Sequence, residues 1–522
     1  MATVLDTIAP FANEPIITFR DEKSKSAMLD ALKSVRASFG TTYDLVIGGK
    51  RVTSPKQTAS NNPSKPSEVI GTVQAATVEQ AQAAVTAAEA AFKTWSRVPA
   101  SRRADLLFKA AAEVRRRRFE FDAWLVLEVG KSWIEADGDV AEGIDFLEYY
   151  AREMLRFDGT HPVTPIPGEK NGMHYIPLGV GVIIPPWNFA FAIMVGMTAA
   201  SIVTGNTVVL KPSSDSPVVA AKFVELLESV GLPPGVLNFI TGSGGAIGDE
   251  LVKNPRVRYI AFTGSKEIGL RVNQLAAQPQ PGQIWIKRVV AEMGGKDSIV
   301  VAADADLDAA VEGVAQAAYG YQGQKCSACS RAIVEAPIYD EFIAKLAERV
   351  KKISVGDAAD PSNYMGPVIN ERSLKKIQSY VEEGKREGRL VSGGGRVGNE
   401  GWFAEPTVFA DIPPDGKLAQ EEIFGPVLAV IKAKDFDHAL EIANNTEFGL
   451  TGAVYSSDAA KLARARDEFH VGNLYLNRKC TGAMVGAHPF GGFNMSGTDS
   501  KAGGPDYLLL FMQAKSVSEK IG

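Results

Sequence analysis

Cys326 is the side chain of this sequence best placed for covalent chemistry. It lies in the segment Gly-Gln-Lys-Cys-Ser at 323–327, between a helix predicted over 306–320 and a strand predicted over 332–335. The glycine-bounded polar loop favours an accessible thiol, and the positive charge of Lys325 is expected to lower its pKa. Because the thiolate is the nucleophilic form of cysteine, Cys326 is a candidate nucleophile.

The two other cysteines indicate less chemistry. Cys329 completes a Cys-x-x-Cys spacing with Cys326, but a structural zinc site needs a second ligand pair at matching spacing and the sequence has none. We therefore expect no metal site, and a redox pair is the weaker alternative. Cys480 is expected to be a packing or loop residue.

Glu292 is the candidate general base. The five histidines, at 161, 174, 438, 470 and 488, lie in no recognisable protease context, which gives a Cys–His hydrolase little support. Glu292 follows an apolar strand at 289–291 and precedes two glycines, 294 and 295. A carboxylate at the carboxyl end of a strand is well placed for a cleft, although a surface turn is the commoner explanation for this residue alone.

Two glycine turns suggest a nucleotide site. The first, Gly-x-Gly-x-x-x-Gly at 242–248, is one residue longer than the usual dinucleotide fingerprint and lacks the acidic residue that should follow. The second, Thr263-Gly264-Ser265 with Gly269, joins a strand to a helix whose free N–H groups suit a pyrophosphate. Tight packing of the glycines is the alternative for each turn.

A strand–helix alternation is expected to position these residues. It begins near residue 176 and predicts right-handed crossovers and a mostly parallel sheet. The predicted strands are 180–184, 207–210, 236–240, 259–262 and 299–301, with helices over 218–230 and 246–253. A second alternating block runs from about 306 to 477, and no solenoid period is present.

The region before this alternation is predicted to be mainly helical. A helical extension over 22–39 has four apolar residues on one face, Met28, Leu29, Leu32 and Val35. Thr77 and Gln80 form a capping box before an Ala-rich helix that ends near Trp95. A long helical region is expected from 101 to about 129.

Composition and charge exclude several classes of protein. The chain has 522 residues, 61 acidic and 56 basic side chains, and a formal net charge of -5. Apolar residues make up 45%, which excludes a disordered tail protein and a fibrous repeat. The mild acidity argues against binding of nucleic acid or an anionic membrane. The basic run at 115–118 is therefore interpreted as a solvated helix end.

The sequence also carries no membrane or targeting pattern. Its longest apolar stretch, 189–204, is too short for a membrane span and is predicted to be a buried helix. The first twenty residues lack a basic-then-apolar signal pattern. Three cysteines in a chain of this size suit a reducing compartment, so we expect a cytoplasmic location.

Taken together, these segments resemble the aldehyde dehydrogenase superfamily. The similarity covers nearly the whole chain from about residue 45, and seven motifs follow in the family's order, which argues against accidental similarity. The motifs are Pro186-Trp187-Asn188-Phe189, Lys211-Pro212-Ser213, Phe262-Thr263-Gly264-Ser265, Glu292-Met293-Gly294-Gly295-Lys296, Gly323-Gln324-Lys325-Cys326, Glu422-Ile423-Phe424-Gly425-Pro426 and Pro489-Phe490-Gly491-Gly492.

The resemblance implies an α/β protein with the aldehyde dehydrogenase fold. Residues 1–154 and 176–291 would form a Rossmann-like NAD-binding domain, and 292–488 an α/β catalytic domain. Residues 155–175 and 500–522 would form a small β flap for oligomerisation. Relatives form dimers and some of these assemble further, so we expect a homodimer or a hexamer of dimers.

The resemblance also implies a mechanism. Cys326 would attack the aldehyde carbon, and the Asn188 amide with the Cys326 backbone N–H would stabilise the oxyanion. Loss of hydride to the nicotinamide would leave a thioester. Glu292 would then act as general base on the water that hydrolyses it.

The cofactor implied by the resemblance is NAD. Its expected contacts are Pro186, Trp187, Lys211, Ser213, Ser214, Gly244, Gly248, Thr263, Gly264, Ser265, Gly294, Glu422 and Phe424. At the position of Ser214, NAD-preferring relatives often have a glutamate that repels a 2′-phosphate. We therefore expect NADP to be tolerated although NAD stays preferred.

Within the superfamily, the chain resembles the branch that oxidises L-glutamate γ-semialdehyde, formed from 1-pyrroline-5-carboxylate. The N-terminal extension, the run 326–331, the lengthened segment 279–287 and the region 481–498 carry this likeness. It implies substrate contacts from Ser327, Gly482, Ala483, Phe189 and Phe490, with Glu142 as a less certain ammonium partner or a solvated helix carboxylate.

Other functions stay open on the sequence alone. The first alternative is oxidation of a different ω-semialdehyde or an aliphatic aldehyde by the same mechanism. A non-enzymatic descendant of the fold is the other, against which the intact pair Cys326 and Glu292 argues. Proline dehydrogenase is a candidate partner.

Overall fold

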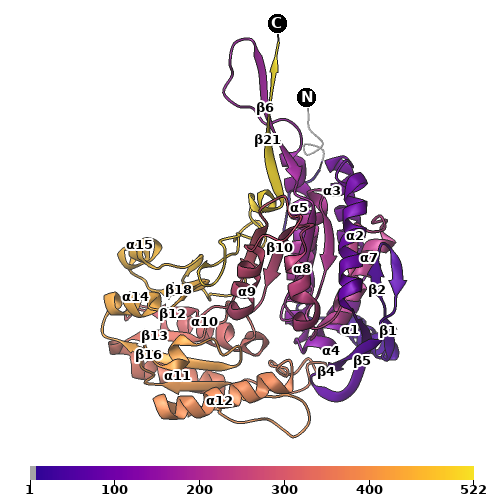
Figure 1. Cartoon of the computed structure of the whole chain (residues 1–522). Coiled ribbons are helices and arrows are strands. Elements are labelled where there is room, and N and C mark those ends of the chain that lie inside the picture. Colours follow the sequence, from indigo (N-terminus) through magenta and orange to yellow (C-terminus); the bar gives the residue numbers. More distant parts are fainter. Residues whose placement is uncertain (1–7, 522) are drawn as a thin grey trace.

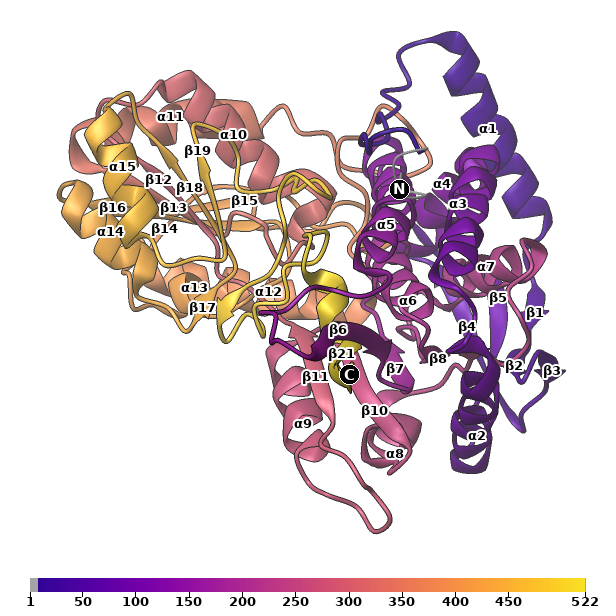
Figure 2. The same cartoon turned by 90° about the horizontal axis from the view of Figure 1, so that it is seen from above.

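Two seven-stranded sheets form the centre of the structure, a computed structural model that describes residues 8–521. Figure 2 shows the two sheets side by side, each with its own helices, and Figure 1 shows the same arrangement from the side. The chain completes most of the first sheet before it enters the second at residue 298.

The first sheet has the strand order β11-β10-β7-β8-β9-β2-β3. Its strands are β2 (Leu45–Ile47), β3 (Lys50–Val52), β7 (Val180–Ile184), β8 (Thr207–Leu210), β9 (Leu237–Phe239), β10 (Val257–Thr263) and β11 (Arg288–Glu292). The five strands β7 to β11 run parallel, and β2 pairs antiparallel with β9 and β3. Every residue of β8 is buried, as expected for a parallel sheet covered on both faces.

Helices cover both faces of this sheet. One face packs against α2 (Val78–Trp95), α8 (Asp249–Lys253) and α9 (Lys266–Ala276). The other face packs against α6 (Ala192–Val203), α7 (Pro217–Ser229) and the bundle α3 (Ala100–Arg116), α4 (Arg118–Val129) and α5 (Trp133–Phe157), with α1 (Glu22–Ala37) outside. The bundle thereby carries the N-terminal segment and, through α5, one side of the site described below.

The second sheet has the strand order β14-β15-β16-β13-β12-β18-β19 and is parallel except for β14. Its strands are β12 (Ser298–Val301), β13 (Arg331–Glu335), β14 (Arg389–Ser392), β15 (Thr407–Ala410), β16 (Val427–Ala433), β18 (Thr451–Tyr455) and β19 (Asn473–Leu476). Its helices are α10 (Leu307–Tyr319), α11 (Tyr339–Val350), α12 (Glu371–Glu387), α13 (Lys417–Gln420), α14 (Phe436–Asn444) and α15 (Ala459–Glu468).

Smaller sheets complete the fold. β1 (Thr41–Tyr43), β5 (Lys65–Ala75) and β4 (Lys56–Asn62) form a three-stranded sheet, and β17 (Phe448–Gly449) pairs with β20 (Phe493–Asn494). β6 (Glu169–Pro177) and β21 (Met512–Lys520) form an antiparallel ribbon that projects from the body in Figure 1. All of β21 after Met512 is exposed. Among the described residues, no helix is both long and apolar enough to cross a membrane.

The predicted elements are largely confirmed. The five predicted strands exist, with ends shifted by at most two residues, and the Thr77–Gln80 capping box forms in both directions. Two details are wrong. The helix expected from 101 to about 129 is two helices, because the backbone breaks at Arg117 (φ -103, ψ 19). On α1, Leu29 is 55% exposed, while Met28, Leu32 and Val35 are buried.

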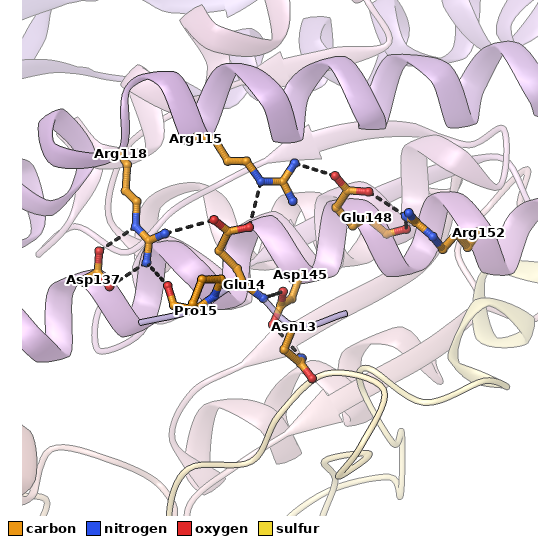
Figure 3. Close-up of polar contacts among 9 residues, drawn as sticks. All are labelled: Asn13, Glu14, Pro15, Arg115, Arg118, Asp137, Asp145, Glu148 and Arg152. Carbon is orange, nitrogen blue, oxygen red and sulfur yellow. Dashed lines mark hydrogen bonds and ion pairs between the residues drawn. The ribbon is translucent and has the colours of Figure 1, made fainter. Parts of the chain in front are cut away.

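The basic run 115–118 is not simply a solvated helix end. Arg118 is only 8% exposed, and its guanidinium binds the carboxylate of Asp137 at 2.6 Å and the carbonyl of Pro15 at 2.7 Å. Arg115 binds Glu14 and Glu148 (Figure 3). The run therefore fastens the N-terminal segment to the helical bundle, a tertiary contact that charge counting along the sequence cannot reveal.

Candidate active site

A strained turn presents Cys326 between the two sheets. After α10 ends, Tyr321, Gln322 and Gly323 all take left-handed backbone conformations, with φ values of 49, 56 and 66. For the two residues with side chains this costs about 1–2 kcal/mol each. Side-chain hydrogen bonds hold the turn: Tyr321 Oη donates to Val129 O at 3.0 Å and Gln322 Nε2 to Gly130 O at 2.9 Å.

The turn after β11 brings Glu292 to the same place. A Cβ atom on Gly295 would lie 2.5 Å from the backbone oxygen of Cys326, and one on Gly294 would collide with the carboxylate of Glu422. Only glycine permits this approach, because the Cys326 oxygen that a Cβ at 295 would strike belongs to the backbone. The two glycines noted in the sequence therefore let the carboxylate turn and the nucleophile loop touch.

Glu292 is a half-buried residue whose carboxyl group accepts two hydrogen bonds. Ser500 Oγ donates to its Oε1 at 2.6 Å and the Gly492 N–H donates to its Oε2 at 3.1 Å. Burial raises its pKa to about 7, although both hydrogen bonds favour the ionised form. A group that is about half ionised near neutrality suits a general base.

The prediction that Lys325 lowers the pKa of Cys326 is wrong. Lys325 Nζ turns away and pairs with Glu135 at 2.7 Å. Burial, together with the negative charges of Asp297, Glu422 and Glu292, raises the pKa of the Cys326 thiol well above its ordinary value. In the protein without ligands the thiol is therefore protonated at neutral pH and needs a base.

Asn188 lies beside the nucleophile loop at the start of the Asn-Phe turn after β7. Its Nδ2 donates to the carbonyl of Gln324 at 3.0 Å, two residues before Cys326. The amide carries a second N–H, and the backbone N–H of Cys326 has no hydrogen-bond partner within residues 8–521. Two donors thus stay available near the thiol.

The other two cysteines lie in the core. Cys329 and Cys480 are buried and unpaired in disulfides, and both belong to the apolar cluster that covers one face of the second sheet. No cluster of metal-binding side chains occurs among the described residues. Cys480 Sγ lies 3.4 Å from Ser327 O, so its role here is to pack the loop that follows the nucleophile.

Several expected cofactor contacts gather around a hollow of about 320 Å³ beside the nucleophile loop. Glu422 and Phe424 line it together with Gly295. The Trp187 ring, which follows Pro186 at the carboxyl end of β7, meets the Phe424 ring edge-on at 5.5 Å. Glu422 accepts the Gly295 N–H at 3.1 Å, and burial raises its pKa. A half-buried carboxyl group that accepts a backbone N–H suits a ribose hydroxyl.

Lys211 is an unusual buried cation. It is 5% exposed, and burial lowers its pKa to about 8. Its Nζ reaches only the carbonyl of Pro212, at 3.3 Å. Ser213 Oγ accepts the N–H of Asp215 at 3.3 Å, and Ser214 is exposed next to it. A buried ammonium with one carbonyl partner has donors left for a ligand.

The two glycine turns differ in function. A Cβ on Gly244 or Gly248 would meet nothing within 4 Å, so the backbone there faces open space. Thr263 ends β10, the Gly264 N–H binds Glu292 O at 3.0 Å, and Ser265 caps α9 without a side-chain hydrogen bond. Gly269 was expected to face the pyrophosphate, but a Cβ there would strike the Met293 side chain, so this glycine serves packing.

A loop at 481–488, which we call the anchor loop, contains the expected substrate contacts Gly482 and Ala483. Arg478, missed in the sequence, donates from Nη2 to the carbonyls of Thr481 and Gly482, each at 3.0 Å. In planar trans peptides the following N–H groups, of Gly482 and Ala483, point the opposite way. Neither has a partner among the described residues. Two adjacent free N–H groups form an anion-binding nest.

The other residues expected to contact the substrate are polar, aromatic or charged. Ser327 lies behind Cys326, and its Oγ makes no hydrogen bond within the described chain. The Phe189 ring rests 4.1 Å from the buried Lys131 Nζ, while Phe490 is held by a two-way backbone bridge to Ala502. Glu142 of α5 is half-buried, and burial raises its pKa to about 8.

These features define the class of protein. The model of the aldehyde dehydrogenase family matches residues 51–517, and the chain therefore belongs to that family, as the motifs predicted. Among curated relatives, 1-pyrroline-5-carboxylate dehydrogenase from Geobacillus kaustophilus is 58% identical over 512 residues, which cover 98% of this chain and 99% of the relative. The protein of the same name from Bacillus cereus is 54% identical over 514 residues, 98% of this chain and 100% of the relative.

Solved structures agree in fold. The crystal structure of 1-pyrroline-5-carboxylate dehydrogenase from Thermus with bound NAD superposes with a TM-score of 0.97 at 52% identity, and the match covers 98% of this chain and 100% of that one. Proline utilization A from Bdellovibrio bacteriovorus gives a TM-score of 0.97 at 46% identity, over 98% of this chain and 53% of that one. The predicted α/β fold is confirmed.

Proposed function

We propose that this enzyme oxidises L-glutamate γ-semialdehyde, the open form of 1-pyrroline-5-carboxylate, to L-glutamate with NAD. This is the second step of proline catabolism. The observation that carries the substrate assignment is the anchor loop, whose free Gly482 and Ala483 N–H groups suit an α-carboxylate. Full-length relatives named for this reaction support it. A simple aliphatic aldehyde offers the loop no group to bind.

The cofactor assignment agrees with the residues present. Lys211 is buried, Glu422 is half-buried, each has few hydrogen-bond partners among the described residues, and the backbone at Gly244 and Gly248 faces open space. We propose that Lys211 and Ser213 hold the adenosine ribose and that Ser265 lies near the pyrophosphate. Trp187, Glu422 and Phe424 would hold the nicotinamide half. When bound, the nicotinamide accepts the hydride from the substrate carbon.

The first step uses Cys326 and Glu292. Because the thiol is protonated, a base must take its proton before the sulfur attacks the aldehyde carbon, and Glu292, with a pKa of about 7, is suited to do so directly or through water. The carbonyl oxygen becomes an oxyanion. The Asn188 amide and the Cys326 N–H stabilise it, at about 3–4 kcal/mol for each good donor.

The last step hydrolyses the Cys326 thioester, after the proton that Glu292 took from the thiol has passed to solvent. Glu292 then takes a proton from water, the resulting hydroxide attacks the acyl carbon, and the C–S bond breaks to release L-glutamate and the Cys326 thiolate, which regains a proton from Glu292. The geometry allows this dual use, since the small residues Gly491 and Gly497 flank the carboxylate. The carboxylate therefore moves without displacing a bulky side chain.

Product analysis tests the assignment. Purified protein with 1-pyrroline-5-carboxylate and NAD should yield L-glutamate and NADH in equal amounts, and Cys326→Ala should yield neither. Succinic semialdehyde and propanal serve as comparison substrates and should give kcat/KM values lower by about tenfold or more, since they lack the α-amino acid group. Equal rates for all three would contradict the substrate assignment and favour an aldehyde dehydrogenase of broad specificity.

Assembly and location are proposed on other grounds. The exposed ribbon β6–β21 is a two-stranded element, which is marginal alone, so we propose that it packs against a second copy in a homodimer or a hexamer of dimers. We propose the domain boundaries stated above, with the ribbon as oligomerisation element. The bacterial relatives support a cytoplasmic location, and proline dehydrogenase stays a candidate partner.

A further inference from the structure

A segment near the N-terminus crosses the helical bundle on its way to α1. We call residues 9–19 the strap. Arg118 Nη2 binds the Pro15 carbonyl at 2.7 Å (Figure 3). Arg152 binds the Ala9 carbonyl at 3.1 Å, and the Ile17 N–H donates to Asp137 at 2.6 Å. Contacts along its whole length hold the strap to α3, α4 and α5.

One strap residue reaches beyond the bundle to the anchor loop. Asn13 Nδ2 donates to the Asp145 carboxylate of α5 at 2.8 Å and to the carbonyl of Val485 at 2.9 Å. Asp145 also accepts the Glu14 N–H at 2.7 Å, which fixes the orientation of the strap at this point. Asn13 thus connects a rigid helix to the middle of the loop.

Aromatic packing reinforces this connection. Phe11 meets Tyr149 of α5 edge-on, with ring centroids 5.1 Å apart. A Cβ on Gly486 would lie 3.1 Å from Phe11 and 3.2 Å from Tyr149, so the two rings press against the loop backbone. Gly486 has a φ of 78, which only glycine adopts without strain.

The Val485 carbonyl, to which Asn13 donates, lies close in the chain to the proposed substrate contacts. Val485 follows Ala483 by two residues, and its carbonyl accepts no other hydrogen bond within the described chain. Arg478 orients one side of the loop through the carbonyls of Thr481 and Gly482. Asn13 is the side-chain donor on the other side, so the Gly482 and Ala483 N–H groups lie between two fixed points.

We propose that Asn13 is a specificity-determining positioning residue, which holds the anchor loop so that the Gly482 and Ala483 N–H groups converge on the α-carboxylate of the substrate. This inference rests on the proposed function. Asn13 touches neither the substrate nor Cys326. Its loss should weaken recognition of the carboxylate and leave the chemistry at the thiol intact.

Asn13→Ala tests this with two substrates, 1-pyrroline-5-carboxylate and propanal. The loss of one hydrogen bond corresponds to a change of up to about tenfold. We expect the KM for 1-pyrroline-5-carboxylate to rise about five- to tenfold at nearly unchanged kcat, and kcat/KM for propanal to change less than about twofold. The strap keeps its bonds through Arg118, Arg152 and Ile17, so the variant should fold.

Two further variants separate loop positioning from strap attachment. Glu14→Gln weakens the ion pairs to Arg115 and Arg118 but leaves the Asn13 amide in place, and it should retain the KM of the parent. Phe11→Ala removes the ring that covers Gly486 and should raise the same KM selectively. The latter keeps the proposal testable if Asn13→Ala is unstable.

The outcomes are distinct. A KM for 1-pyrroline-5-carboxylate that is unchanged in both Asn13→Ala and Phe11→Ala would overturn the proposal, and so would equal losses with propanal and 1-pyrroline-5-carboxylate. Failure of the proposed function looks different, because the parent enzyme itself would then show no preference for 1-pyrroline-5-carboxylate over propanal.

Discussion

Removal of the Ser500 hydroxyl should raise the pKa of Glu292 and shift the pH dependence of thioester hydrolysis. The hydroxyl donates to Glu292 Oε1 at 2.6 Å and favours the ionised carboxylate. A hydrogen bond to a charged group contributes about 1.5–3 kcal/mol, which corresponds to about 1–2 pKa units. The Gly492 N–H still binds the carboxylate, so we expect the lower end, about one unit above the present value.

The direction of the change in hydrolysis rate follows from the role of Glu292 as general base. Glu292 acts while ionised, and its pKa of about 7 leaves about half of it ionised at pH 7. A pKa one unit higher leaves about one tenth ionised, so hydrolysis at pH 7 should fall about fivefold and recover above about pH 9. The substitution should shift the acid limb of the pH–rate profile and leave the rate on its plateau unchanged.

Deacylation after a p-nitrophenyl acetate burst measures this step without a cofactor, because an activated ester acylates a thiol directly. Rates from about pH 6 to about pH 10 give the acid limb. Ser496→Ala is the matched control, since this serine lies in the same loop and its Oγ binds the Gly449 N–H rather than Glu292. An acid limb for Ser500→Ala that coincides with the parent and with Ser496→Ala would refute the reasoning.

Three shorter predictions follow from other contacts. Lys325→Met should leave the pH dependence of Cys326 alkylation by iodoacetamide unchanged, because Lys325 pairs with Glu135; an upward shift of the midpoint would restore the sequence interpretation. Gly295→Ala should lower kcat by about 100-fold through a clash with the Cys326 carbonyl, and steady-state rates near the parent would contradict the close approach. Ser214→Glu should raise the ratio of kcat/KM for NAD over NADP about tenfold or more by like-charge repulsion, and an unchanged ratio would place the 2′-phosphate elsewhere.

Much of the scaffold could be predicted because it depends on local pattern. The strands 180–184 and 207–210 are β-branched runs, and the Thr77–Gln80 box satisfies N–H groups within one turn. The break at Arg117 was not predictable in this way, since good helix formers continue on both sides. The burial of Arg118 against Asp137 brings the two residues together across two helices, which no local pattern encodes.

The same distinction between local sequence pattern and tertiary contact applies to the residues of the site. Cys326, Glu292 and Asn188 are found from motifs, and the structure brings their loops together through Gly295 and Gln324. Motifs give the neighbours of a residue in sequence but not the direction of its side chain. For this reason the prediction that Lys325 lowers the pKa of Cys326 is wrong. Arg478 lies three residues before a suspected substrate contact, so a search for donors near Thr481 could have found it.

Acid–base chemistry at the site depends on two pKa values that burial shifts in the same direction. The same burial that makes the Cys326 thiol harder to ionise raises the pKa of Glu292 towards neutrality. A thiol that stays protonated in the resting enzyme is less susceptible to oxidation, because the thiolate is the reactive form. The nearby carboxylate thus supplies the activation that the lysine next to the cysteine does not.

Direct observation of the acyl-enzyme tests the central claim, that Cys326 carries the substrate and Glu292 releases it. In Glu292→Gln the thiol lacks its base, so the test is run at alkaline pH, where the thiol ionises without one; rapid mixing with 1-pyrroline-5-carboxylate and NAD should then give a burst of NADH close to one per active site, followed by slow turnover. Acid-quenched protein should carry the mass of one γ-glutamyl group on the peptide that contains Cys326. Steady NADH production without a burst, or a modification on any other residue, would contradict the account.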